Sequence, residues 1–246
     1  MTVSRFKKIF LTEFKQIFRV PDIYVIAFFL PVFVTLILRG IFSMNALPGS
    51  EYSVLEYSFG GIVSIGICGT GIMGLSSILS EYRHNGILKR FMVSPVSPLA
   101  LMMSIYLSLM ILSIFSSIAV MIEFYIMFSF TIQSSIFILI YLFAMIAIFS
   151  NGMLVASLVP NQRIGNVITM LIYFPTLFIS GTTIPYEVLP DIVQKVSMIL
   201  PMTHAIKLMK ETALGIPVTD NILSILYLTI TFIIFTLLSI KYFKWS

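Results

Sequence analysis

The stretch LSEYRHNGILKRFMVSPVSPLALMM, residues 79–103, separates two long apolar runs and decides how the chain is organised. Between Glu81 and Arg90 it places an acid, a histidine and three cations, and prolines follow at positions 95 and 98. The apolar runs on either side, 58–80 and 99–122, each reach the length of about 20 residues that a helix needs to cross a bilayer. We therefore predict a compact charged connection between two membrane spans.

The composition of the whole chain indicates a polytopic membrane protein. Of its 246 residues, 59% are hydrophobic and 10% are charged, and the mean hydropathy is +1.05, whereas soluble domains carry about 25% charged residues. The net charge of +5 comes from cations at the ends of apolar runs, a pattern typical of cytoplasmic loops and not of nucleic-acid binding. The single cysteine, Cys68, excludes a disulfide or metal framework within one chain.

The hydropathy pattern predicts an all-α membrane protein with one domain over residues 1–246. Six spans are expected, at 23–43, 58–80, 99–122, 136–158, 164–184 and 221–240. Lysine and arginine precede the first span and follow the second, fourth and sixth, so the positive-inside rule places both termini in the cytoplasm. The connection at 185–220 departs from this pattern, with three lysines on the predicted outer side offset by four acids. The isoleucine and phenylalanine content and the simple loops indicate a bacterial plasma membrane.

The first 21 residues form a basic amphipathic segment. Phe6, Phe10 and Phe14 recur at helical spacing, and the cations fall on the opposite face. Such a helix lies in the membrane interface, with its rings among acyl chains and its cations near anionic headgroups. Two interpretations stay open: an ordinary cytoplasmic-side anchor, or a helix that also contacts a cytoplasmic partner.

The second span is rich in small residues. Gly66, Thr70 and Gly74 recur every four residues and share one helix face, which allows another helix to approach closely. This face packs either against helices of the same chain or at a subunit interface or transport pathway.

A third unusual region precedes the last span. Prolines at 185, 190, 201 and 217 divide it into two helix-like pieces, 188–200 and 203–214, each too short to span and too apolar for water. We predict a re-entrant helical hairpin over 185–215 on the outer side; the alternative is an amphipathic surface helix.

Catalytic motifs are absent from the sequence. It contains no phosphate-binding loop of the G-x-x-x-x-G-K-[ST] type, no H-E-x-x-H pair and no G-x-S-x-G elbow. Two charges fall within apolar runs, Arg39 in the first span and Glu123 near the outer end of the third. They either extend to the interface or contact each other or an anionic substrate.

The order of these features resembles the membrane subunit of ABC-2 type transporters over essentially the whole chain. The family's pattern E-x-x-x-x-G-x-x-x-R followed by proline is matched by Glu81, Gly86, Arg90 and Pro95. A second signature, a Ser-Gly pair followed by spaced prolines, is matched by Ser180, Gly181, Pro185, Pro190 and Pro201, with Gly215 closing the region. The sequence departs from the family pattern at His84-Asn85 and at Ile87.

The resemblance implies a non-catalytic export subunit that holds no cofactor, with ATP and magnesium bound by a separate ABC ATPase. Residues 81–95 would be a coupling helix docked on that ATPase, and two such membrane subunits, identical or related, would form the pathway in the bilayer. The docking residues would be Glu81, Arg83, Gly86, Lys89, Arg90 and Pro95, and the hairpin would shape an outer gate. The cargo would be an amphiphilic or hydrophobic compound such as a drug, a peptide antibiotic or a lipid. The alternative is a stand-alone secondary transporter or channel, which would need ionisable residues within spans and inverted repeats.

Overall fold

A computed structural model describes residues 3–42, 52–92, 98–159, 162–183, 186 and 189–243, and these ranges contain helices and no β-strand. The α-helices are α1 (Val3–Ile17), α2 (Pro21–Tyr24), α3 (Leu30–Phe42), α4 (Val54–Cys68), α5 (Leu75–His84), α6 (Ile87–Met92), α7 (Pro98–Phe128), α8 (Phe137–Leu158), α9 (Gln162–Ile179), α10 (Asp191–Ser197), α11 (Pro201–Ala213) and α12 (Ile222–Tyr242). Two π-helical segments, η1 (Val25–Phe29) and η2 (Gly69–Gly74), continue α2 into α3 and α4 into α5, and a 3-10 turn, η4 (Val218–Asn221), precedes α12.

Four helical stretches in the described part of the chain are long and apolar enough to cross a membrane. They are Val54–His84, Ala100–Phe128, Phe137–Leu158 and Ile222–Tyr242, which correspond to the second, third, fourth and sixth predicted spans. The first and fifth predicted spans fall on shorter apolar helices, Val25–Ile41 and Arg163–Ile179. The all-helical membrane fold is thus confirmed, while the count of six spans stays a prediction.

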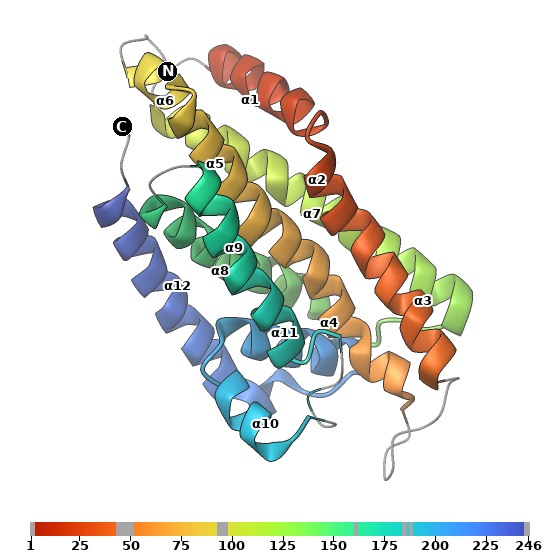
Figure 1. The fold of residues 1–246 in the computed structure, drawn as a ribbon. Helices are drawn as coiled ribbons and strands as arrows, with labels where there is room; N and C mark the ends of the chain where they lie inside the picture. The colour runs from red at the N-terminus through yellow and green to blue at the C-terminus, as the bar shows by residue number, and fades with distance from the viewer. Residues whose placement is uncertain are drawn as a thin grey trace.

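The stretch Val54–His84, built from α4, η2 and α5, is the central helix of the bundle. Its most apolar window is 89% buried, against 17% for that of α12 at the edge. The helices α3, α7, α8, α9 and α11 pack around it, and α12 packs on α8 (Figure 1). We call the end of the bundle that carries α6 the loop end, and the end that carries α10 and α11 the hairpin end.

Small residues explain why so many neighbours fit around the central helix. A Cβ atom at Gly66 would overlap the hydroxyl of Ser116 on α7, and one at Gly74 would lie 3.2 Å from Cδ2 of Leu109. The hydroxyl of Thr70 donates a hydrogen bond to the carbonyl of Gly66 at 2.9 Å, as is common in buried helices. Gly66, Thr70 and Gly74 are buried within this chain, which favours the interpretation that they pack against its own helices.

The N-terminal helix α1 is amphipathic and packs against α7. Phe10 and Phe14 stack with 5.9 Å between their ring centroids, and Phe18, directly after the helix, packs edge-on against Phe14 with 4.9 Å between the centroids. Ile17 is buried on the inner side, and Lys15 is exposed. The helix expected within residues 1–21 is present; its place at a membrane surface stays a prediction.

Candidate functional site

The charged connection at the loop end is divided between the last turn of the central helix and the short helix α6. The central helix ends at His84, and α6 starts at Ile87 after a turn in which the backbone N–H of Gly86 donates to the carbonyl of Arg83 at 3.1 Å. Gly86 has a φ of +66°, a left-handed conformation that glycine adopts without a Cβ penalty. This geometry corrects the expectation of one continuous helix over 81–95. Pro95 lies outside the described residues.

Four of the proposed docking residues are accessible at the loop end. Lys89 and Arg90 are exposed on α6, and Glu81 and Gly86 are half-buried. Glu81 also lines a cavity of about 590 Å³ together with Lys15 and Arg19 at the end of α1. The accessible face of this end is therefore mainly basic.

Arg83 is placed differently from the expectation. Its side chain is 8% exposed and points into the bundle, where both terminal nitrogens donate to the carbonyl of Ala156 at 3.3 Å. Nη1 also donates to the carbonyl of Val159, and the guanidinium lies 5.5 Å from the ring centroid of Phe243. Arg83 thus satisfies carbonyls at the C-terminal end of α8, where a helix leaves them unpaired. This placement corrects the expectation that Arg83 lies on the polar side facing a partner.

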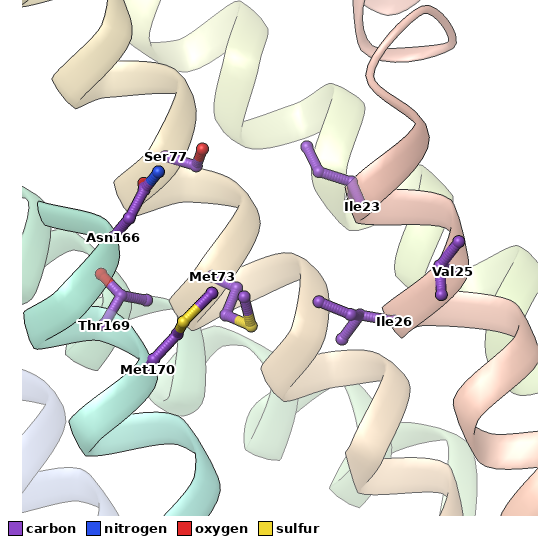
Figure 2. Close-up of a pocket in the computed structure, with 8 residues that line it drawn as sticks. All are labelled: Ile23, Val25, Ile26, Met73, Ser77, Asn166, Thr169 and Met170. Carbon is purple, nitrogen blue, oxygen red and sulfur yellow. The ribbon is translucent and has the colours of Figure 1, made fainter. Parts of the chain in front are cut away.

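A lateral groove of about 400 Å³ runs between the central helix, the first predicted span and α9. Figure 2 shows that Met73 and Ser77 come from the central helix and Asn166, Thr169 and Met170 from α9. The opposite wall is formed by Ile23, Val25 and Ile26. A hydrogen bond of 2.8 Å between the hydroxyls of Ser76 and Thr169 joins the two helices beside the groove.

Both π-helical segments border this groove. Val25 and Ile26 belong to η1 and Met73 belongs to η2, and the two segments contact each other. The two segments come close because Gly69 has no side chain. A Cβ atom at this position would lie only 2.7 Å from Cγ2 of Ile26. π-Helical turns occur often at functional sites, so their meeting here marks the groove as a candidate binding site. Sequence reasoning did not single out Asn166, Met73 or Met170; the glycine-rich run at 69–74 was the available signal.

At the hairpin end, α10 lies within the piece expected at 188–200, and α11 covers most of the piece expected at 203–214 but starts two residues earlier. Pro190 directly precedes α10, and Pro201 is the first residue of α11, a position that lacks an intrahelical donor in any case. Gly181 has a φ of +82° and turns the chain after α9, beside the buried Ser180. Pro185 lies outside the described residues.

A second pocket, of about 270 Å³, lies beneath the hairpin. It is lined by Tyr57, Ser180, Gly181, Tyr186, Met198, Thr203, Ile206, Lys207, Lys210 and Glu211. Lys210 is buried, with its ammonium 4.9 Å from the ring centroid of Tyr57. The structure therefore brings the Ser180–Gly181 turn and α11 together at one pocket, and the role of these residues as an outer gate stays a prediction.

The hairpin is also joined to α12 through His204. Its Nε2 lies 2.9 Å from the carbonyl oxygen of Met198, so this nitrogen carries the proton, and Nδ1 accepts from the hydroxyl of Ser224 at 3.1 Å. The imidazole stacks on Tyr227 with 4.3 Å between the ring centroids. Burial lowers the pKa of His204; the nearby Lys207 lowers it further, and the hydrogen bond to Met198 acts in the opposite direction.

Arg39 and Glu123 are not joined to each other. The guanidinium of Arg39 lies 5.8 Å from the ring centroid of Phe128. The carboxylate oxygens of Glu123 are buried, with no hydrogen-bond partner among the described residues. The hypothesis of a direct contact between these two charges is therefore corrected. Within the same ranges, no group of three or more histidine, cysteine, aspartate or glutamate side chains is placed to hold a metal ion.

Residues 4–214 match the sequence profile described as ABC-2 type transporter. The chain belongs to the ABC-2 type transporter family. As a member of this family it is a membrane transport component, and the family implies an ATP-binding partner subunit. The matched range includes the charged connection, the groove and the hairpin, so each of these features belongs to the transport domain.

Parts of the chain are similar to proteins named Nodulation protein J. The protein from Rhizobium leguminosarum bv. viciae is 33% identical over 97 residues, which is 38% of this chain and 38% of the relative. The one from Neorhizobium galegae is 33% identical over 105 residues, covering 39% and 40%. The one from Sinorhizobium fredii is 38% identical over 68 residues, covering 28% and 26%. The matched segments thus span less than half the length of these relatives.

Proposed function

We propose that this member of the ABC-2 family is the membrane subunit of an ATP-driven exporter whose cargo is an amphiphilic or hydrophobic compound. Two copies, or one copy and a related subunit, form the pathway in a bacterial plasma membrane. ATP and magnesium are bound by separate ABC ATPase subunits at the loop end, which faces the cytoplasm. The observation that carries the proposal is the family match over residues 4–214 together with the lateral groove.

The lining of the groove supports an amphiphilic cargo. Ile23, Val25, Ile26 and the two methionines offer an apolar surface, and methionine adapts its shape to different ligands. Ser77, Asn166 and Thr169 add polar atoms, which can orient the polar part of a bound molecule. A volume of about 400 Å³ falls within the range of small-molecule sites. Cargo dissolved in the adjoining leaflet would enter from the side.

The loop end supports docking on an ATPase. Lys89 and Arg90 are exposed on a short helix whose direction is set by Gly86, and such cations form charge-assisted hydrogen bonds with acidic partners. Exposed charges on one helix give a partner a defined point of attachment. The hairpin, which lies at the far end of the bundle, would shape the exit (Figure 1).

Reconstitution tests this proposal. The chain is incorporated into proteoliposomes with and without the ABC ATPase that co-purifies with it, and movement of a short-chain NBD-labelled phospholipid is read by dithionite accessibility. We expect ATP-dependent movement only when both proteins are present. Filling the groove by M73W and M170W should reduce the rate at least tenfold, whereas I126W on an exposed site of α7 should leave it unchanged.

The alternative, a stand-alone transporter or channel, predicts the opposite result in this experiment. Such a protein would retain no ATPase during purification and would move the probe equally well without ATP. That pair of results would replace the export proposal by the alternative.

A further inference from the structure

Two consecutive residues at the loop end of α5 bind opposite sides of the bundle. The hydroxyl of Tyr82 donates to Oε2 of Glu13 on α1 at 2.7 Å, whereas Arg83 donates to the carbonyls of Ala156 and Val159 at the end of α8. Tyr82 is 4% exposed and Arg83 is 8% exposed. Because successive residues of a helix point about 100° apart, one residue reaches each side.

Glu13 is unusual for its position on α1. It is the one acid among the residues of this helix, and it is 5% exposed while Lys7, Lys8 and Lys15 are exposed. Burial raises the pKa of Glu13, and the hydrogen bond from Tyr82 opposes this effect. A carboxylate that served only as a solvated surface charge would not be buried against a neighbouring helix. The buried carboxylate of Glu13 is therefore placed to accept the hydrogen bond from the hydroxyl of Tyr82.

The other side of α5 is joined to two helices. The carbonyls at the end of α8 have no intrahelical donors. The guanidinium of Arg83 donates hydrogen bonds to two of them, those of Ala156 and Val159. The same guanidinium lies over the ring of Phe243, directly after α12. One arginine thus links the base of the charged connection to the ends of both α8 and α12.

We infer that Tyr82 and Arg83 form a two-sided clamp, together with Glu13 and the end of α8, that makes α1, the α5–α6 connection and the loop ends of α8 and α12 move as one body. On the proposed function, a displacement of α6 by a docked ATPase would then reach both flanks of the bundle at once. Glu13, Tyr82 and Arg83 are positioning residues and do not themselves touch the ATPase or the cargo.

The packing of α1 shows what this hydrogen bond adds. The long contact of α1 is with α7, and the hydrogen bond from Tyr82 to Glu13 supplies a polar connection between α1 and α5. When it is removed, α1 keeps its contact with α7 but loses this constraint relative to α6. The clamp therefore predicts a specific change in the distance between α1 and α6.

Spin-label distances measure this change in the full chain in nanodiscs. In a C68S background, which removes the single cysteine, labels are placed at K15C on α1 and K89C on α6, both exposed sites. The reference pair is K15C with M103C, an exposed site on α7. Y82F and E13L remove the hydrogen bond, whereas E13Q keeps an acceptor of similar size. A second pair, K89C with K241C on α12, reports the effect of R83M.

We expect Y82F and E13L to broaden the α1–α6 distance distribution at least twofold, while the α1–α7 distribution stays unchanged and E13Q behaves as the unmodified chain. R83M should broaden the α6–α12 distribution to a similar degree. Unchanged α1–α6 widths in Y82F and E13L would overturn the clamp, and so would equal broadening of the α1–α7 pair, because that would report general loosening.

A second measurement separates the clamp from the proposed function. In the complex with the co-purified ATPase, Y82F should retain the ATPase but lower the stimulation of ATP hydrolysis by the membrane subunit at least fivefold, and E13Q should preserve it. If the chain retains no ATPase, the proposed function fails, and the spin-label distances still decide whether the clamp exists. Full stimulation in Y82F would show that the clamp does not transmit motion and would overturn the inference.

Discussion

The backbone of Gly60 in α4 approaches the backbone of Lys210 in α11 so closely that a Cβ atom at Gly60 would lie 2.6 Å from the amide nitrogen of Lys210 and 2.9 Å from the carbonyl oxygen of Ile206. Backbone atoms cannot move aside as the end of a flexible side chain can. The hairpin helix α11 therefore packs on the central helix at a position that only glycine permits. This contact determines how closely α11, the second helix of the hairpin, packs against α4.

Replacement of Gly60 by alanine should consequently separate α4 from α11. Overpacking of this kind costs about 1–3 kcal/mol, which corresponds to a fall of several degrees in the unfolding temperature of the purified chain in detergent. The matched control is G40A in α3, where nothing lies within 4 Å of the new Cβ atom. That change should be neutral or slightly stabilising, by up to about 1 kcal/mol. Equal unfolding temperatures for the two variants would contradict the close seating of α11.

Arg83 and Arg90 should differ sharply when each is replaced by methionine. R83M leaves buried carbonyls at the end of α8 without a donor, and loss of hydrogen bonds to a charged group costs about 1.5–3 kcal/mol. R90M changes an exposed side chain, and such changes stay within about 0.5 kcal/mol. Thermal unfolding in detergent compares the two, and a larger loss for R90M than for R83M would show that the buried placement is wrong.

Gly86 offers a test of the docking geometry. An alanine there meets no steric neighbour, but the left-handed conformation costs an L-residue about 1–2 kcal/mol, so the turn should relax and redirect α6. We expect G86A to bind the ATPase about 5- to 30-fold more weakly if docking must restore the turn. G86N should bind nearly as well as the unmodified chain, because asparagine tolerates this conformation. Affinity measured by co-purification under dilution distinguishes these outcomes; equal weakening in both variants would rule out the conformational explanation.

The hairpin should loosen on acidification. The pKa of His204 in the folded chain lies below its ordinary value of 6.5 because the ring is buried. The folded state thus binds fewer protons than the unfolded state, so the contribution of His204 to stability is complete above pH 6.5 and is lost as the pH falls through the folded pKa. Between pH 7.5 and 5 we expect the unfolding temperature of the unmodified chain to fall more than that of H204N. Parallel pH profiles for the two proteins would refute this role of His204.

Several features followed from local pattern alone. The helix α10 lies within the expected piece 188–200, and α11 starts at Pro201, two residues before the expected 203–214. Both agree closely with the sequence because proline restricts where a helix begins, independently of distant contacts. The second, third, fourth and sixth predicted spans correspond to long apolar helices because segment length and hydropathy are properties of the segment itself. The close packing of the glycine-rich span was likewise anticipated, although its partner was not.

Other features depend on which distant segments meet. The direction of Arg83 could not be read from its charge, since the same residue type suits a docking surface or the end of a buried helix. The groove joins residues from three regions, around Ile26, Met73 and Asn166, whose separations in sequence carry no signal of proximity. Arg39 lies over Phe128 rather than beside Glu123 because the relative positions of α3 and α7 decide which side chain is within reach.

The sequence by itself determined a basic amphipathic segment, a set of apolar helices, a charged connection and a proline-divided hairpin, because hydropathy, charge and backbone restriction act within single segments. The tertiary structure alone decided that Tyr82 donates a hydrogen bond to Glu13 and that Arg83 points inward to the end of α8. It also decided that a lateral groove lies beside the two π-helical segments. These contacts arise from packing between helices, and their geometry depends on backbone approach distances that small residues such as Gly60 and Gly69 permit.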